Sequence, residues 1–372
     1  MKQGWEYKKL GDCTQILDSQ RKPVTKKDRI GGIYPYYGAT GIQDYVDKYI
    51  FDGRYVLVGE DGAKWSAFEQ SAFIIEGKSW VNNHAHVLKP HDLLVDTFLI
   101  YFLNYSDLDS YISGAIVRKL TQASLRNIDI PLPPKSTQLT IVSELDKINE
   151  LIRLKKEQLK DYDNLAQSIF YEMFGDPVEN EKGWEVKKLG EVCTIERGSS
   201  PRPITAYITD SKDGINWIKI GDAQEGSKYI TSTKEKIKPE GLKKSRFVHK
   251  GDFILSNSMS FGKPYILKID GCIHDGWLVI HDNNNVFIKI YLYYLLASSI
   301  MYAKFSKLAV GGVVNNLNSS LVRKVDVSIP PLPLQHLFAQ RIEQIEHQKS
   351  EVTKAITDLE TLLASRMQHW FE

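Results

Sequence analysis

Residues 183–195 read "GWEVKKLGEVCTI" and repeat the segment "GWEYKKLGDCTQI" at residues 4–16, with an offset of 179. A longer match has an offset of 197 and needs no gap: "GAIVRKLTQASLRNIDIPLPP" (114–134) lies over "GGVVNNLNSSLVRKVDVSIPP" (311–331). The second copy therefore holds 18 more residues between its two matched ends. This pattern indicates a duplicated module whose frame is kept and whose interior varies.

Each copy divides into a globular part and a helical part. The globular parts contain β-branched runs such as "YVLVG" (55–59) and "DFILSNS" (252–258), bounded by turn residues, which predict mixed α+β domains. The prolines that follow stop the earlier element and stand where a helix can begin. We therefore predict four parts. They are a globular domain at 1–133, a long helix at 134–175, a second globular domain at 176–331 and a second long helix at 332–372.

The two predicted helices carry apolar residues at steps of three and four, which is the spacing of a coiled coil. Lys155, Lys349 and Arg366 interrupt the pattern. The predicted seam, which would act as a spacer, consists of Ile141, Leu145, Ile148, Ile152, Leu159, Tyr162, Ile169, Phe338, Ile342, Ile345, Val352, Ile356, Leu359 and Leu363.

These apolar stripes require a partner helix, because each side chain left in water forgoes about 1.5–3 kcal/mol of burial. The duplicate helix is the obvious partner, and a helix of another subunit is the alternative. The ends of a domain tend to lie close together, so the second helix should start near the end of the first and run back along it. The predicted fold class is α+β, with two similar globular domains separated by two long antiparallel coiled-coil helices in an internal pseudo-two-fold repeat.

Cysteine usage and hydropathy limit the class of protein. Cys13, Cys193 and Cys272 are too few and too scattered for a disulfide framework or a zinc site. There is no run of about eighteen apolar residues of the kind that crosses a membrane. We therefore expect a cytoplasmic protein with no membrane partner.

Basic residues gather in both globular parts, and residues 177–331 carry 22 basic and 16 acidic side chains. Two related domains suit a ligand with two related sites, and duplex DNA is the common one. A solvated charged face is the alternative interpretation. The candidate phosphate contacts are Arg21, Lys22, Lys26, Lys27, Lys243, Lys244 and Arg246.

Three polar loops are candidates for contacts with bases: "YPYYGATG" (34–41), "NNHAH" (82–86) and "SNSMSFGKP" (256–264). Asparagine can read adenine in the major groove. Tyrosines at such spacing are also common in protein cores. The His-x-His pair in the second loop has no third ligand near it, so we expect no metal site.

The sequence lacks the common catalytic motifs. "FGKPY" does not complete a phosphate-binding loop, and neither G-x-S-x-G nor H-E-x-x-H occurs. Two alternatives to DNA reading remain. One is a two-headed adaptor that binds proteins, and the other is a metal-dependent nuclease using Glu60, Asp61 and Lys64 in "GEDGAKW" (59–65).

The order of parts, with "PLPP…Q" and "PPLP…Q" before the two long helices, resembles the specificity subunit of type I restriction-modification systems. Two further segments carry the resemblance, "YPYYGATGIQDYVDKYIFDGRYVLVGEDGA" (34–63) and "GDFILSNSMSFGKP" (251–264). The likeness covers nearly the whole chain. It implies a non-catalytic protein with two target-recognition domains, each reading one half of a bipartite, asymmetric DNA site, and helices that fix the spacer.

The resemblance also implies partners that carry the chemistry. Two modification subunits would dock on the helices and methylate adenine at N6 with S-adenosylmethionine, and restriction subunits would use ATP and Mg²⁺. This chain would bind none of these cofactors. The positions that match the loops of the family, and that we expect at the DNA, are Tyr36, Tyr37, Gly38, Asn82, His84, Asn257, Ser258, Gly262 and Lys263.

Overall fold

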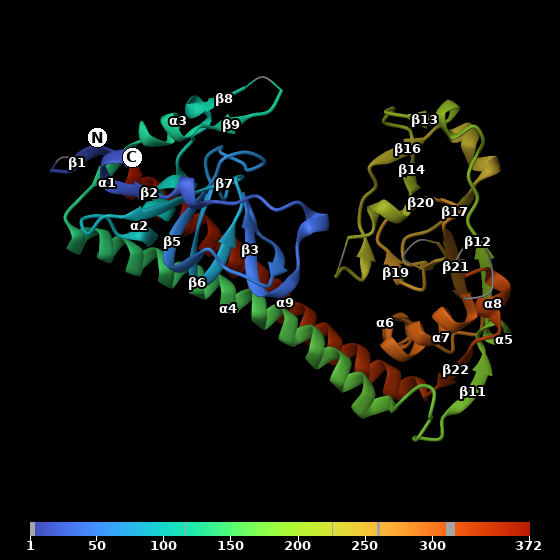
Figure 1. Ribbon diagram of the computed structural model, residues 1–372. Coiled ribbons are helices and arrows are strands. Elements are labelled where there is room, and N and C mark those ends of the chain that lie inside the picture. The colour runs from blue at the N-terminus through green and yellow to red at the C-terminus, as the bar shows by residue number, and fades with distance from the viewer. Residues whose placement is uncertain (1–3, 115, 225, 259–260, 310–316) are drawn as a thin grey trace. The chain divides into compact units, whose positions relative to one another are not determined.

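The computed structural model describes residues 4–114, 116–224, 226–258, 261–309 and 317–372 (Figure 1). Residues 311–316 of the long repeat match and Met259 and Ser260 of the third candidate loop lie outside the described residues. The chain forms two compact units. The first comprises Met1–Glu157 with Thr353–Glu372, and the second comprises Gln158–Val352.

The first unit is built on a six-stranded sheet. Its order is β2 (Thr14–Ile16), β7 (Ala85–Pro90), β5 (Phe51–Gly59), β6 (Ala72–Val81), β3 (Gly31–Gly38) and β4 (Gly41–Val46). Successive side chains of β5 point to opposite faces of the sheet. Val56 and Val58 therefore lie in one apolar cluster and Leu57 in another, so this strand is buried on both faces. Helix α2 (Asp96–Tyr105) packs against β5 and β6 on the side of Val56 and Val58.

The second unit contains two five-stranded sheets. One has the order β12 (Cys193–Arg197), β21 (Trp277–Asp282), β18 (Phe253–Ser256), β19 (Pro264–Leu267) and β15 (Tyr229–Ile230). The other has the order β13 (Ile208–Thr209), β16 (Glu235–Ile237), β14 (Ile215–Ile218), β20 (Gly271–Ile273) and β17 (Arg246–Val248). Helices α6 (Lys289–Ala297) and α7 (Ser299–Ala309) follow β21 in the chain. Helix α6 packs against β19.

The duplication in the sequence is also a duplication of strand pairing. The strands β2, β7, β5 and β6 are adjacent in the first unit, as β12, β21, β18 and β19 are in the second. Equivalent residues are paired: Val56 lies opposite Leu88, and Phe253 lies opposite Ile280. Most of the extra length of the second copy forms its second sheet, where the first copy has the β3–β4 hairpin.

The matched ends of each copy form a small two-stranded junction. Strand β1 (Glu6–Lys9) pairs with β10 (Asp129–Leu132), and β11 (Glu185–Lys188) pairs with β22 (Asp326–Ile329). The short helices beside these strands are α1 (Leu10–Cys13), α3 (Gln122–Arg126), α5 (Leu189–Val192) and α8 (Ser319–Arg323). A Cβ at Gly11 would lie 3.0 Å from Arg126 Cβ, and one at Gly190 would lie 2.7 Å from Arg323 Cβ. This close approach explains why each copy has a glycine in its first matched end, where it faces an arginine of the second.

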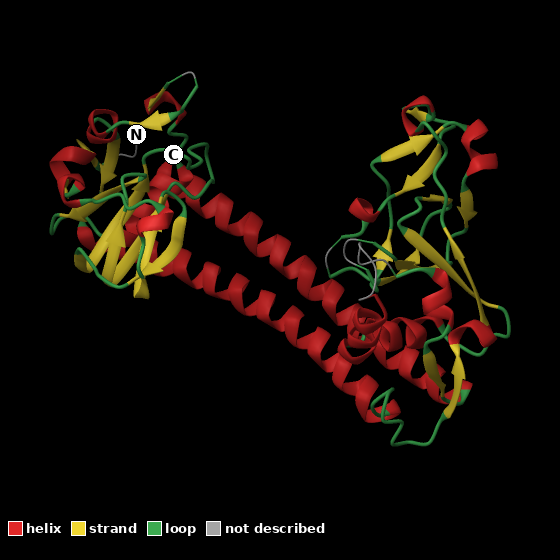
Figure 2. Ribbon diagram, turned by 45° about the vertical axis from the view of Figure 1, so that its right-hand side comes forward, coloured by secondary structure: helices red, strands yellow, loops and turns green. Residues whose placement is uncertain are grey.

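Two 40-residue helices, α4 (Lys135–Phe174) and α9 (Leu332–Phe371), dominate the helical content (Figure 2). In the first unit, Arg366 pairs with Glu144 and Lys156 pairs with Glu360, so the two helix segments run antiparallel. In the second unit, Lys349 bonds Asp163 at 2.6 Å, and Phe338 packs against Phe170 and Phe174. These helix segments therefore run antiparallel as well. The predicted α+β fold with two long antiparallel helices is confirmed.

Residues of the predicted seam are most deeply buried near the globular domains. Ile141, Leu145 and Phe338 are inaccessible to solvent. Ile148, Ile152, Ile342, Ile345, Val352 and Ile356 are also buried, whereas Leu159, Tyr162, Ile169, Leu359 and Leu363 are half-buried. Two of the polar interruptions, Lys349 and Arg366, form ion pairs with the facing helix. In the described part of the chain, no helix is long and apolar enough to cross a membrane.

A buried glutamine joins each globular domain to the start of its long helix. Gln138 accepts a hydrogen bond from Val95 N and donates to Leu93 O and Pro133 O. Its repeat equivalent, Gln335, does the same. Gln335 accepts from Ile288 N at 2.8 Å and donates to Val286 O at 2.9 Å and Pro330 O at 2.8 Å. Both glutamines are fully buried, so water cannot replace these contacts.

Replacing Gln335 with methionine should lower the free energy of unfolding of the second unit by about 2–4 kcal/mol, because three buried backbone groups lose their partner. Hydrogen exchange of the α6 and α9 peptides measures the loss. Gln340→Met, an exposed position on the same helix, is the control and should change little. Equal protection in both variants would show that the glutamine does not hold the junction.

Candidate nucleic-acid interface

Three loops meet at one end of the equivalent strands in each globular domain, here called a head. Strands β2, β7 and β5 are antiparallel neighbours, so the loops after β2 and β5 lie beside the loop that precedes β7. The loops after β12 and β18 lie beside the loop before β21 for the same reason. We call these two places the loop ends of the heads. Loops held by a rigid sheet are where binding residues commonly stand.

Arg21 closes a buried ionic network at the loop end of the first head. It pairs with Glu60 and with Asp18, and it donates to Ala85 O at 2.8 Å. Lys119 bonds the other oxygen of Glu60 at 2.7 Å. Arg21 is only 12% exposed, so the prediction that it contacts a phosphate is corrected: its charge neutralises two buried carboxylates.

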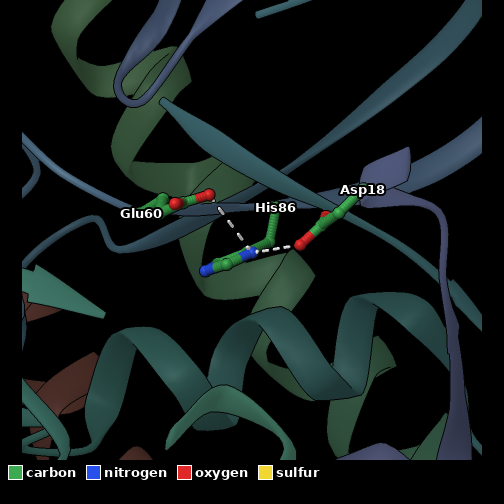
Figure 3. A group of neighbouring side chains, drawn as sticks. All are labelled: Asp18, Glu60 and His86. Atoms are coloured by element: carbon green, nitrogen blue, oxygen red, sulfur yellow. Dashed lines mark hydrogen bonds and ion pairs between the residues drawn. The ribbon is translucent and has the colours of Figure 1, made fainter. Parts of the chain in front are cut away.

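His86 is fully buried between Asp18 and Glu60 (Figure 3). Its Nδ1 lies 2.6 Å from Asp18 Oδ2, and its Nε2 donates to Leu120 O at 2.8 Å. Burial alone would raise the pKa of the Asp18 carboxyl, but the hydrogen bonds from His86, Gln122 and Val87 N outweigh burial and lower it. Burial likewise opposes ionisation of Glu60, and bonds from Lys119 and Arg21 lower its pKa.

Asp18, Glu60 and His86 offer three atoms within 4.8 Å of one another, which is a spacing that a metal ion could use. Two cations already neutralise these carboxylates, so a divalent ion would have to displace Arg21 and Lys119. The contacts do not favour the nuclease alternative either. Lys64 forms an exposed ion pair with Glu69, and Asp61 pairs with His84.

Three other predicted residues of the first head belong to its scaffold. Tyr36 is 1% exposed, and its hydroxyl bonds the backbone of Val24. Gly38 is buried against the side chain of Gln43, which also accepts a hydrogen bond from Asn82. Asn82 is 2% exposed and accepts from His84 N. The predicted base contacts of Tyr36, Gly38 and Asn82 are therefore corrected, because the side chains of Tyr36 and Asn82 are buried and Gly38, which has no side chain, is buried as a whole.

The remaining predicted residues of the first head have access to solvent. Lys22, Lys26 and Lys27 are exposed on the segment that follows β2, and Tyr37 is half-buried. His84 is 47% exposed at the loop end and pairs with Asp61. These side chains remain candidates for contact with DNA.

In the second head, the predicted residues divide in the same way. Asn257 is fully buried and donates to Asp275 O at 3.1 Å. Gly262 has a φ of +77°, and a Cβ there would lie 3.1 Å from Phe305, so it shapes the chain. Both residues are buried, so their predicted DNA contacts are corrected to scaffold. Lys263 is exposed and Ser258 is half-buried.

The basic cluster of the second head is partly tied to the protein. Lys243 and Lys244 are exposed on a 3₁₀ helix (Pro239–Lys244), and Lys244 donates to the hydroxyl of Tyr207 at 2.7 Å. Arg246 pairs with Glu196 at 2.9 Å, so part of its charge is already neutralised.

Residues that sequence reasoning missed also stand at this loop end: Arg197, Ser200, Arg202, His274 and Asp275. The last two precede β21, as Asn82 and Asn83 precede β7. Aligning the strand "WLVIH" (277–281) with "AHVLK" (85–89) would have indicated His274 and Asp275.

Comparison with known proteins gives one consistent result. A model of the type I restriction modification DNA specificity domain matches this chain twice, at residues 2–161 and 181–361. The "Putative type I restriction enzyme specificity subunit S.HindORF215P" of Haemophilus influenzae is 31% identical over 360 residues, covering 94% of this chain and 90% of the relative. The MjaVIII specificity subunit of Methanocaldococcus jannaschii is 22% identical, covering 96% and 92%.

Solved structures share the fold. The S subunit of a type I restriction-modification system from M. genitalium has a TM-score of 0.55 at 13% identity, covering 99% of this chain and 96% of that one. A chain from a structure describing assembly and conformational transition of the type I R-M system has a TM-score of 0.64 at 19% identity, covering 100% and 98%.

The buried carboxylates predict a pH dependence of stability. The pKa values of Asp18 and Glu60 are lowered in the folded state, so their contribution is present above about pH 5 and is lost as the pH falls through their folded pKa values. Asp18→Asn should destabilise the first unit at pH 7 and make the loss between pH 5 and pH 3 shallower. Hydrogen exchange of the β5 and β7 peptides, followed from pH 7 to pH 3, measures the stability of the first unit. Asp47→Asn, at an exposed position, is the control and should keep the wild-type dependence of stability on pH. The wild-type dependence in Asp18→Asn would contradict the account.

Proposed function

This chain belongs to the family of type I restriction-modification DNA specificity proteins, and on that premise we propose that each head reads one half of a bipartite, asymmetric DNA site. The observation that carries the proposal is the double match to the specificity domain, once in each copy. The two heads keep the same four neighbouring strands but differ in the loops at their ends. Two heads with the same strand arrangement but different loops suit two half-sites of different sequence.

The two long helices would fix the spacer between the half-sites and hold two modification subunits. The paired seam within each unit supports a fixed helix geometry. Leu165 and Leu362 are repeat equivalents that face solvent, with 47% and 45% exposure. Exposed leucines at equivalent positions suit a partner that binds both copies in the same way.

The chemistry would be carried by the partner chains. In this proposal the chain is not an enzyme and works in the cytoplasm, where it directs a modification subunit that methylates adenine at N6 with S-adenosylmethionine. Restriction subunits that use ATP and Mg²⁺ would complete the system. The role of this chain is then recognition, supplied by exposed polar and basic side chains at the loop ends.

Mapping of adenine methylation across the genome tests the proposal. Cells that express this chain with its modification subunit should gain methylation at one bipartite motif with two different halves and a fixed spacer. Cells that express the modification subunit alone are the control and should lack the motif. If the purified subunits form a folded complex and no bipartite motif is methylated, the proposed function is wrong.

A further inference from the structure

In the second head, Arg202 stands at the loop end with its side chain 82% exposed. Its NH2 group lies 3.4 Å from Asp275 Oδ2. Within the described part of the chain, Asp275 is its one ionic partner. Most of the guanidinium donors of Arg202 therefore face solvent while one edge is held in place.

Asp275 is itself fixed from several sides. Ser200 Oγ donates to Asp275 Oδ1 at 3.0 Å, and His274 Nε2 lies 2.8 Å from the same oxygen. Gly276 N donates to His274 Nδ1 at 2.9 Å, so Nε2 carries the proton that bonds Asp275. The backbone of Asp275 is also held, because its carbonyl accepts from Arg197 Nε at 2.8 Å and from Asn257 Nδ2 at 3.1 Å.

The surface beside this pair is hollow. A cavity of about 710 Å³ is lined by residues 200–205, by Trp217 and by His274. Lys219 and Glu235 form an ion pair in its wall. The arginine thus lies beside a mostly apolar cavity whose wall contains one ion pair.

The carboxylate beside Arg202 distinguishes two possible roles for the arginine. A phosphate would be repelled by Asp275, which lies within ion-pair distance of the same guanidinium. A base edge brings no such charge. Guanine presents O6 and N7 to the fork of an arginine, and a carboxylate can accept from the N4 amino group of the paired cytosine.

We propose that Arg202 reads a guanine in the half-site bound by the second head, and that Asp275 is the positioning residue that orients it. This inference rests on the proposed function. It adds a specificity-determining residue to the second head and assigns a G·C pair to its half-site. The exposed lysines Lys243 and Lys244 then serve as contacts with the backbone, which carry no sequence information.

The test uses the full complex of this chain with its modification subunit. Methylation is mapped and binding to duplexes is measured for the wild type and for Arg202→Ala, Arg202→Lys and Asp275→Asn. Lys324→Ala removes a positive charge from an exposed position of the second head, between α8 and β22 and outside both long helices, and is the matched control. The duplexes carry each of the four bases at every position of the motif.

We expect one guanine in one half-site to lose its preference in Arg202→Ala and in Arg202→Lys, because lysine keeps the charge but not the fork. Discrimination at that position should fall by roughly 5- to 150-fold. The other half-site and the Lys324→Ala motif should stay the same. Asp275→Asn should relax the same position by a smaller factor without weakening binding overall, which a merely structural role would not produce.

An unchanged motif in Arg202→Ala or Arg202→Lys would overturn the inference and leave the proposed function standing. Relaxation spread over several positions would also overturn it, because a single guanine contact acts at one base pair. A wild-type complex that methylates no bipartite site would overturn the proposed function, and this inference with it.

Discussion

The junction between each head and its own helix is the constraint on which the rest of the structure depends. Gln138 and Gln335 each satisfy three backbone groups with the same geometry in the two copies. A second contact reinforces each junction. Tyr101 bonds Asp146 of α4 in the first unit, and the buried Lys228 bonds Glu346 of α9 in the second. A head that is held to its helix in this way transmits the geometry of the helix to its loop end.

The sequence predicts the frame well because the frame is repeated and periodic. The offsets between the copies and the apolar steps from Ile141 to Leu363 identify the heads and the antiparallel helices. The prediction is weaker for polar side chains, because burial of a polar residue depends on partners far away in the sequence. Arg21 and Asn82 occupy loops typical of a binding site, yet Glu60 and Gln43 hold them in the interior.

The two loop ends show how one frame yields two different surfaces. In the first head, Glu60 follows the central strand and draws Arg21 inward with His86. In the second head, the same place after the strand is taken by Asn257, which is neutral and binds a backbone carbonyl. Arg202 therefore stays outside, held by one carboxylate. Alignment of the two copies can locate the loops. Only the three-dimensional contacts distinguish the loop residues that are buried in the protein from those that are exposed and could contact DNA.

The central claim of the proposed function is that the paired helices would set the distance between two independent readers. Deleting residues 153–159 of α4 together with residues 353–359 of α9 removes one heptad from each helix and keeps the seam in register. Seven helical residues span about 10 Å, which is about three base pairs of DNA. Methylation mapping with this variant should return the same two half-sites with a spacer shortened by about three base pairs. The same half-sites at the wild-type spacing would contradict the account.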